Sequence, residues 1–289
     1  MNGAQRSADL RHRLSARESV LMPGVWDPLS ALIVQQAGFS TAFVSGFAVS
    51  GTLLGRPDVG YLTQTEMAEV AQRVCSSVPT VNVIVDADTG YGDPMTVRRT
   101  VELWEQAGAA GLFLEDQVWP KRCGHMDGKQ VVEREDWLAK LRAACDHRQH
   151  LHVTARTDAR AAVSLNEAIE RAKMARDCGV DALFVEAPQS VEEMEAIANA
   201  LPDITLVANM VEKGKTPLLT PSELADLGFR LIVSPLSLLL SAVQAMSTAA
   251  QRLAHDGSLR TYLDDVAPFD SFTDLVGLSE HLANEKRYS

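Results

Sequence analysis

Residues 85–125 decide the fold of this chain, and they read VDADTGYGDPMTVRRTVELWEQAGAAGLFLEDQVWPKRCGH. An apolar run over residues 81–85 ends in Asp86 and Asp88, and a segment with helical periodicity follows. A second apolar run, residues 111–114, ends in Glu115 and Asp116. Two apolar runs joined by a helix predict neighbouring parallel strands, with these carboxylates at the same end of the sheet.

The same alternation of apolar runs and helical patterns extends along the chain. Eight strand–helix units are the number in a closed (β/α)8 barrel, the TIM barrel, whereas an open doubly wound sheet usually has fewer strands. We therefore expect one α/β barrel domain over residues 1–289, with a helical extension over about residues 254–289. The predicted strands cover residues 19–24, 41–45, 80–85, 111–114, 152–155, 182–185, 205–208 and 230–233.

Local signals place the segments between these strands. Thr63 with Glu66, and Ser164 with Glu167, each predict a helix that begins with a capping box. Residues 46–62, which contain several Gly and a Pro, predict a loop. The first twenty residues mix acids with arginines and lack an apolar core, so they predict a helix rather than a targeting peptide.

Composition excludes several classes of function. The chain has 289 residues, is 46% hydrophobic and carries a net charge of −11, which disfavours binding to a phosphate backbone. The largely apolar run over residues 236–240 is too short to cross a membrane. None of the four cysteines forms a Cys-x-x-Cys pair, so we expect a cytoplasmic protein with free thiols. Its expected partner is a small-molecule substrate. Cys75, Cys145 and Cys178 are expected to pack in helices, and His147, His150 and His152 to be solvated.

Asp86 and Asp88 suggest a metal site. Two residues apart on one strand, their side chains share a face, and two such carboxylates repel unless a cation lies between them. With Glu115 on the next strand, and Asp58 from the loop after the second strand, the donors are all oxygens, which suits Mg²⁺ or Mn²⁺. Capping acids are the alternative. An Asp-x-Asp phosphatase nucleophile is disfavoured because that motif normally follows the first strand.

A cysteine in a basic loop is the second candidate site. Cys123 lies between Lys121-Arg122 and His125, and the positive charges should lower its pKa and favour proton transfer near neutral pH. Gly124 and Gly128 would let this loop close over a substrate. The alternative is a surface cysteine without a function. A zinc site is disfavoured because Cys-x-His lacks a second ligand pair at the usual spacing.

Polar residues that follow other strands complete the expected site. Arg156 ends an apolar strand, where it can bind a substrate carboxylate bidentately or pair with Glu186; we favour substrate contact. The turn after the second strand offers backbone N–H groups and a hydroxyl for an anion, although a plain turn is the alternative. The other residues assigned to substrate binding are Ser45, Gly46, Phe47, Gly124, Asn209, Thr216 and Pro217.

These motifs resemble the isocitrate lyase/phosphoenolpyruvate mutase superfamily over about residues 23–253. The resemblance implies a (β/α)8 barrel that binds Mg²⁺ and forms a tetramer in which C-terminal helices are exchanged between subunits. The matching stretches begin at Asp86 (DADTGYG), Leu114 (LEDQ), Lys121 (KRCGH), Arg156 (RTDA), Asn209 (NM) and Gly214 (GKTP).

Within the superfamily, the Lys-Arg-Cys-Gly-His loop looks like that of the C–C bond lyases, and the closest likeness is to 2-alkylmalate lyases. Two departures separate the chain from methylisocitrate lyases. Phe47 stands where they usually have a glycine, and leucines follow Ser237 where they carry an arginine suited to a third carboxylate. Because an unpaired buried carboxylate is costly, we expect a dicarboxylate with a small alkyl group.

The resemblance implies an oxo-acid lyase that splits such a substrate into a 2-oxo acid, such as pyruvate, and a carboxylic acid. Cys123 would protonate the carbanion, while His125 and Arg122 hold the loop. Glu186 and Lys121 are the candidates for the base that takes the substrate hydroxyl proton. The alternatives are carboxyphosphonoenolpyruvate phosphonomutase or phosphonopyruvate hydrolase, oxaloacetate hydrolase, methylisocitrate lyase, and a non-catalytic barrel.

Overall fold

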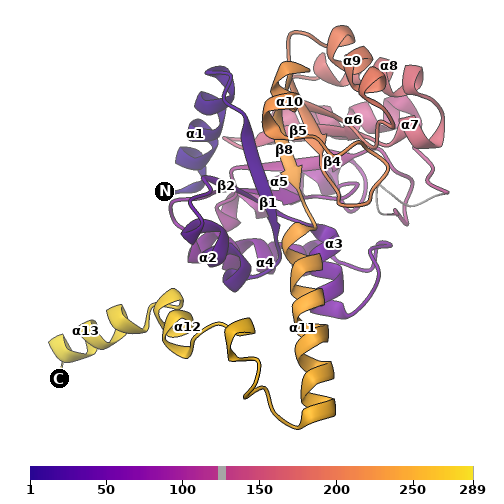
Figure 1. Cartoon of the computed structure of the whole chain (residues 1–289). Helices are drawn as coiled ribbons and strands as arrows, with labels where there is room; N and C mark the ends of the chain where they lie inside the picture. The colour runs from indigo at the N-terminus through magenta and orange to yellow at the C-terminus, as the bar shows by residue number, and fades with distance from the viewer. Residues whose placement is uncertain (123–127, 289) are drawn as a thin grey trace.

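The computed structural model describes residues 1–122 and 128–288. Eight parallel strands close into a barrel in chain order, as the sequence predicts, with helices around it (Figure 1). Most predicted strand ends lie within one or two residues of those observed. The strands are β1 (Val20–Val25), β2 (Thr41–Val44), β3 (Asn82–Asp86), β4 (Gly111–Glu115), β5 (His152–Thr157), β6 (Ala182–Val185), β7 (Thr205–Asn209) and β8 (Phe229–Ser234).

Most of the helices around the barrel begin at side-chain caps. Thr63 and Glu66 form the predicted capping box. The box predicted at Ser164 is wrong in part: Ser164 caps its helix, but the Glu167 carboxylate pairs with Arg134 and Arg171 instead of the cap. The helices are α1 (Gly3–Ser15), α2 (Pro28–Gln36), α4 (Gln64–Ser77), α5 (Pro94–Ala107), α6 (Arg134–His147), α7 (Ala159–Ala162), α8 (Leu165–Arg176), α9 (Val191–Ala200), α10 (Pro221–Asp226) and α11 (Ser237–Asp256). Within the described residues, α6, α7 and α11 begin without a side-chain cap.

The segment after β2 corrects a second prediction. Where the sequence predicts a loop over residues 46–62, a short helix α3 (Gly46–Val49) runs into a π-helical turn, η1 (Ser50–Leu54). The Ser45 hydroxyl caps α3, and Ala48 and Val49 are fully buried. Burial of these apolar residues stabilises a helical turn that the glycines alone do not favour.

Two apolar layers hold the barrel together. The outer layer lies between the strands and the helices and is centred on Trp104 and Trp137, both fully buried. The inner layer fills the barrel with Met22, Ile84, Leu231 and their neighbours. Leu10 and Leu14 of α1 belong to the same inner cluster, so α1 closes the amino-terminal end of the barrel.

Arg6 joins α1 to the barrel through main-chain carbonyls. Its guanidinium is buried and donates to the carbonyl oxygens of Gly108, Cys75 and Val78 at 2.8, 2.8 and 2.9 Å. These carbonyls lie in the last turn of α4 and at the C-caps of α4 and α5, where helices leave acceptors without partners. Arg6 therefore satisfies three acceptors at the closed end of the barrel.

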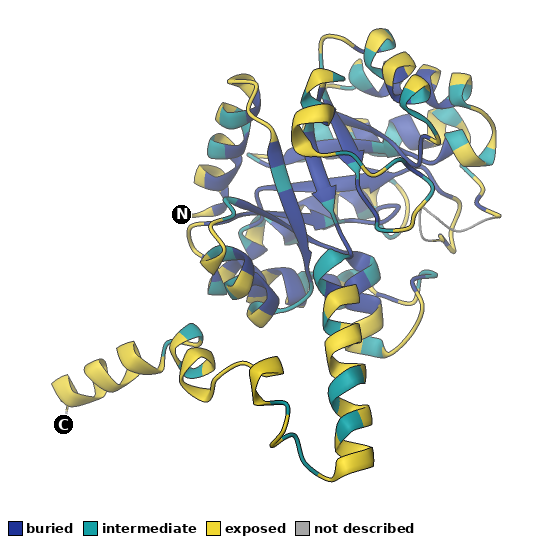
Figure 2. Ribbon diagram, viewed as in Figure 1, coloured by how far each residue is buried: buried dark blue, intermediate teal, exposed yellow. Residues whose placement is uncertain are grey.

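The C-terminal segment extends away from the barrel (Figure 1). It comprises α11, a 3-10 turn η2 (Leu263–Asp265), α12 (Phe269–Leu275) and α13 (Leu278–Tyr288). Figure 2 shows this arm as largely exposed, in contrast to the buried strands. Several of its exposed residues are large and apolar, including Met246, Leu263 and Phe269 at 62%, 65% and 78% exposure.

Two further observations concern the expectations from composition. Across residues 1–122 and 128–288, no helix has the length and apolarity needed to cross a membrane. Cys75, Cys145 and Cys178 are free thiols on or beside helices. The expectation that His152 is solvated is wrong: it is 1% exposed, on the same face of β5 as Arg156, which points into the barrel.

Replacing Arg6 by Met should lower the free energy of unfolding by about 3 kcal/mol, because three buried carbonyl groups lose their donor. Urea denaturation measures this change. Arg73→Met is the matched control, since the Arg73 side chain on α4 is 66% exposed and its ion pair with Glu69 is long, at 3.7 Å. A loss below about 1 kcal/mol for Arg6→Met would contradict the role given to Arg6.

His152 should make stability depend on pH. Burial lowers the pKa of its imidazole from 6.5 to about 4. Between these values the unfolded chain binds a proton that the folded chain does not, so stability falls as pH falls from 6.5 to 4, by up to about 3 kcal/mol from this residue. Urea denaturation of wild type and His152→Gln at several pH values isolates the effect. A difference in the free energy of unfolding between wild type and His152→Gln that stays constant between pH 7 and 4 would refute this role of His152.

Candidate active site

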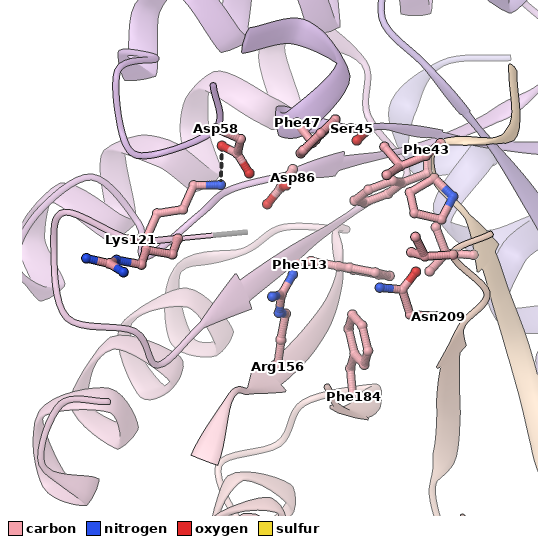
Figure 3. Close-up of a pocket in the computed structure, with 15 residues that line it drawn as sticks. Phe43, Ser45, Phe47, Asp58, Asp86, Phe113, Lys121, Arg156, Phe184 and Asn209 are labelled. Carbon is pink, nitrogen blue, oxygen red and sulfur yellow. Dashed lines mark ion pairs between the residues drawn. The ribbon is translucent and has the colours of Figure 1, made fainter. Parts of the chain in front are cut away.

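One pocket opens at the carboxyl ends of the strands, the face that carries the active site in barrels of this type. Figure 3 shows Arg156, Phe184 and Asn209 on one side of it, opposite Asp58, Phe47 and Ser45. Charged and polar groups line one part and apolar groups another. The lining residues are Phe43, Ser45, Phe47, Asp58, Asp86, Phe113, Lys121, Arg122, Arg156, Phe184, Asn209, Val211, Val233, Pro235 and Leu236.

Lys121 joins two of the carboxylates assigned to the metal. Its ammonium lies 2.5 Å from Asp58 and 2.7 Å from Asp88, and all three side chains are buried. Burial raises the pKa of Asp88 to about 7, although Lys121 opposes this shift. Burial also lowers the pKa of Lys121, but Asp88 and Asp58 outweigh it and hold that pKa well above its usual value. Lys121 is therefore a stable cation inside the acidic cluster.

Asp86 is fixed by backbone N–H groups. It accepts from the N–H of Gly46 at 3.3 Å and from that of Asp88 at 3.0 Å. Asp88 has a φ of 45°, in the left-handed region, so the strand turns sharply just after Asp86. The Lys140 ammonium on α6 donates to the Thr89 carbonyl at 2.9 Å and fixes the next residue of this turn.

Glu115 lies deeper. It is 3% exposed, its Oε2 atom lies 3.4 Å from the Arg156 guanidinium, and its Oε1 atom has no hydrogen-bond partner among the described residues. Burial raises its pKa well above the usual value. A buried carboxylate oxygen without a donor is costly, and a cation beside it would remove that cost.

The charges around the pocket do not balance. With every group ionised, the described residues around it carry two more negative than positive charges, although burial raises the pKa of both Asp88 and Glu115. Oxygen donors of this kind suit Mg²⁺, so the residues fit the ion that the sequence predicts. The same part of the chain has no group of three or more histidine, cysteine or acidic side chains already arranged around a metal position. The Lys121 ammonium lies between Asp58 and Asp88. The groups counted are Asp58, Asp86, Asp88, Glu115, Asp158 and Glu186 against Lys121, Arg122, Lys129 and Arg156.

Arg156 both faces the pocket and pairs with carboxylates. Its Nε donates to Asp158 at 2.9 Å, while Glu115 and Glu186 lie 3.4 and 3.7 Å from the same nitrogen. The guanidinium also lies 5.3 Å from the centre of the Phe184 ring. The two readings of Arg156 from the sequence are thus compatible, since the residue lines the pocket and approaches Glu186.

Glu186 and Asn209 lie side by side at the ends of β6 and β7. The Asn209 amide donates to the Glu186 carboxylate, with N–O distances of 3.2 and 3.3 Å. Glu186 is fully buried, and Asn209 lines the pocket. A carboxylate held by an amide beside the pocket can accept a proton from a bound ligand.

The cysteine loop lies outside the described residues: Cys123, Gly124 and His125 belong to the segment 123–127. Its two flanks are described. The Gln117 side chain bonds both main-chain groups of Arg122, donating to its carbonyl at 2.8 Å and accepting from its N–H at 2.9 Å. An antiparallel bridge joins Gln117 to Val131.

The remaining predicted residues divide. Ser45 and Phe47 line the pocket, and Gly46 lies against Asp86. Thr216 is buried but, like Pro217, it does not line this pocket.

Sequence reasoning missed the aromatic wall formed by Phe43, Phe113 and Phe184. Neighbouring rings lie 4.8 and 5.6 Å apart between centres. Each phenylalanine stands two residues before a predicted site residue, namely Ser45, Glu115 and Glu186, and therefore on the same face of its strand. That spacing is the signal that could have identified them.

Comparison with known proteins agrees with this geometry. The family model described as phosphoenolpyruvate phosphomutase matches residues 10–254. The chain belongs to the isocitrate lyase/phosphoenolpyruvate mutase superfamily. Its sequence is 46% identical to carboxyvinyl-carboxyphosphonate phosphorylmutase of Arabidopsis thaliana, over 96% of this chain and 84% of that protein. It is 39% identical to 2,3-dimethylmalate lyase of Eubacterium barkeri, over 98% of each.

Solved structures of the superfamily share the fold. Oxaloacetate acetylhydrolase, in complex with 3,3-difluorooxalacetate, superposes with a TM-score of 0.94 at 34% identity, over 99% of this chain and 98% of that one. A phosphonopyruvate hydrolase solved with oxalate and Mg²⁺ superposes with a TM-score of 0.88 at 26% identity, over 100% and 99%. Since close superfamily relatives are named lyases and mutases, the chain is an enzyme of this class.

Gly46→Ala should weaken binding of a divalent ion by about tenfold, the size found when a group that orients a ligand is lost. A Cβ at this position would meet Asp86 Oδ2 at 2.9 Å and displace that carboxylate. Titration with Mn²⁺, followed by electron paramagnetic resonance, measures the affinity. Gly51→Ala is the control, because nothing lies within 4 Å of a Cβ there. Equal affinities for the two variants would mean that Asp86 does not contribute to the ion site.

Proposed function

We propose that the protein is a Mg²⁺-dependent carbon–carbon lyase. Its substrate would be a 2-alkylmalate, a small 2-hydroxy dicarboxylate, and its products a 2-oxo acid such as pyruvate and a carboxylic acid. One observation carries the proposal: a single pocket combines an acidic cluster, the Arg156 guanidinium and an apolar wall. A substrate with two carboxylates, a hydroxyl and an alkyl group matches these three surfaces.

Asp58, Asp86, Asp88 and Glu115 would hold the ion, with Mn²⁺ as a second candidate. The bound ion supplies a Lewis acid that lowers the pKa of the substrate hydroxyl and stabilises the 2-oxo acid. The Lys121 ammonium contacts both Asp58 and Asp88 and offsets part of the repulsion between their carboxylates. The support for a cation is the cluster of buried carboxylates around Lys121 and the Glu115 oxygen that has no hydrogen-bond partner among the described residues.

Arg156 and Asn209 would bind the substrate carboxylate on which negative charge develops during cleavage. Both line the pocket, and preorganised donors are most effective where charge appears in the transition state. The turn after β2 would bind the other carboxylate through the Ser45 hydroxyl and the Phe47 N–H, and Gly46 would let the ligand approach closely while its own N–H donates to Asp86. Gly124, Thr216 and Pro217 stay proposed substrate contacts from the sequence, although Thr216 and Pro217 do not line the pocket.

The alkyl group would lie against the apolar residues that line the pocket. Val211, Val233 and Leu236 border the pocket beside β7 and β8, and no arginine follows Leu236 before residue 252. A third carboxylate placed there would be buried without a cation, which favours an alkylmalate over methylisocitrate.

Proton transfers need a base and an acid. Lys121 is a poor base, since its neighbouring carboxylates hold its pKa well above the usual value. Glu186, buried beside Asn209, would take the hydroxyl proton. When the C2–C3 bond breaks, its electron pair stays on the departing carboxylic acid, and the Cys123 thiol would protonate that carbon. His125 and Arg122 would hold the loop that carries Cys123.

A P–C bond reaction is the second candidate. The 46% identity with the Arabidopsis phosphorylmutase favours it, and that relative acts on a phosphonate by its name. Oxaloacetate hydrolysis is a third, supported by the fold similarity to oxaloacetate acetylhydrolase.

We also propose that one barrel domain, with its extension over about residues 254–289, assembles into a tetramer by exchanging the C-terminal helices. The support is the exposed apolar surface of α11, α12 and α13, which a second subunit would cover. Sedimentation velocity tests it, and a monomer at micromolar concentration would refute it. We further propose a cytoplasmic location, although the similar Arabidopsis protein is named as chloroplastic.

The substrate is tested by incubating the enzyme and Mg²⁺ with separate candidates and following the products. We expect pyruvate from 2-methylmalate or 2,3-dimethylmalate, and none when EDTA is added. Cleavage of methylisocitrate to pyruvate and succinate at a comparable rate would contradict the prediction that the apolar lining of the pocket disfavours a third carboxylate. Phosphate from phosphonopyruvate, or oxalate from oxaloacetate, with the alkylmalates intact would replace the proposal by the corresponding alternative.

Cys123→Ala should lower kcat for 2-methylmalate by at least about a hundredfold, the usual contribution of a general acid. Mn²⁺ affinity should stay at the wild-type value, since the thiol is not assigned to the ion. Cys178→Ala is the control, because Cys178 lies just after α8, beside the carbonyls of Met174 and Leu138. A Cys123→Ala enzyme with wild-type kcat would remove the thiol from the mechanism.

A further inference from the structure

Asp158 fixes the orientation of Arg156. The Asp158 carboxylate receives Nε of Arg156 at 2.9 Å on one oxygen and Nη2 at 3.1 Å on the other, a bidentate pair. Asp158 is fully buried, yet Arg156 and then Lys129 outweigh the burial and lower its pKa to about 2. With Nε and one Nη2 hydrogen used in this way, the rest of the guanidinium is left for the pocket that Arg156 lines.

Asp158 has a second cation on its far side. The Lys129 ammonium donates to Asp158 Oδ1 at 2.7 Å, the same oxygen that accepts from Arg156 Nη2. The side chain of Lys129 is 1% exposed. A buried lysine is expensive unless it is paired, so this contact is a specific feature of the site rather than a surface ion pair.

The main chain holds both partners in place. Val118 N–H donates to the Gln130 carbonyl, and Val132 N–H to the Asp116 carbonyl, each at 2.9 Å, so the segment with Lys129 is paired to the chain that leaves β4. On the other side, Asp116 accepts from the Asp158 N–H at 2.8 Å. Asp116 is itself held by the Thr157 hydroxyl and by Arg171 of α8.

We propose that Lys129 is a positioning residue that acts through Asp158 to aim the Arg156 guanidinium at a ligand carboxylate. The inference rests on the proposed function, which assigns Arg156 to the substrate. Lys129 itself lies behind Asp158 and does not line the main pocket. The hydrogen bond from Lys129 fixes the Asp158 carboxylate in place. The fixed carboxylate in turn holds the Arg156 guanidinium in one orientation.

Geometry and charge make different predictions here. Arg156 lies near three carboxylates, those of Glu115, Asp158 and Glu186. If Lys129 supplies only positive charge, then removing one negative charge together with it restores the balance. If Lys129 positions Arg156 through Asp158, then losing the Asp158 carboxylate as well leaves Arg156 without its bidentate partner and restores nothing.

The test is calorimetric binding of oxalate, a small planar dianion, to the Mg²⁺-loaded protein. We expect Lys129→Met to weaken oxalate binding about tenfold, as for residues that orient a ligand-binding group. Lys129→Arg keeps the positive charge and should remain within about threefold of wild type, since an arginine can also donate a charge-assisted hydrogen bond to the Asp158 carboxylate. The decisive variant is Lys129→Met with Asp158→Asn, which we expect to stay at least as weak as Lys129→Met.

Two controls separate the positioning role from loss of the fold and from loss of the ion. Thermal melting confirms that each variant is folded, and Mn²⁺ affinity, read by electron paramagnetic resonance, should be unchanged in Lys129→Met. Wild-type affinity for oxalate in Lys129→Met or in the double variant would overturn the proposal, and so would an equal loss of Mn²⁺ affinity. Oxalate binding needs no bond cleavage, so failure of the wild type to cleave an alkylmalate would count against the proposed function and not against this inference.

Discussion

Crowding of carboxylates at the mouth of the barrel is the constraint on which the site depends. Asp86, Asp88 and Glu115 end two adjacent strands, and neighbouring carboxylates in a buried setting repel unless cations lie among them. Lys121 offsets part of this repulsion, because its ammonium lies between Asp58 and Asp88. The remaining negative charge is what makes a divalent ion a natural occupant.

The barrel produces this crowding through its register. Because the strands are parallel and in chain order, their carboxyl ends lie close together: Glu115, the last residue of β4, is paired with Arg156, and Thr157, the last residue of β5, with Val185. Inward-facing positions two residues deeper carry the phenylalanines. The charged side chains at the strand ends therefore lie above the phenylalanines of the aromatic wall, and a ligand with both polar and alkyl parts can contact both layers.

Much of this was accessible from the sequence, because alternation and strand ends are local properties. The barrel, its eight strands and the clustering of Asp86, Asp88, Glu115 and Arg156 followed from them. Contacts between distant segments were not accessible: Lys129 meets Asp158 across 29 positions, and Lys121 meets Asp58 across the barrel mouth. His152 was misjudged because its polar type favours solvent, whereas its place on β5 directs it inward. The α3–η1 segment was misjudged because its glycines concealed buried apolar contacts.

The central claim is that this pocket breaks a C–C bond and protonates the resulting carbanion. The most direct test is to treat 2-methylmalate with the Mg²⁺-loaded enzyme in D₂O and to analyse the products by proton NMR. We predict equal amounts of pyruvate and acetate, with one deuterium in each acetate methyl group at early times. Acetate without deuterium, or 2-methylmalate left intact by an enzyme that consumes phosphonopyruvate, would contradict this claim.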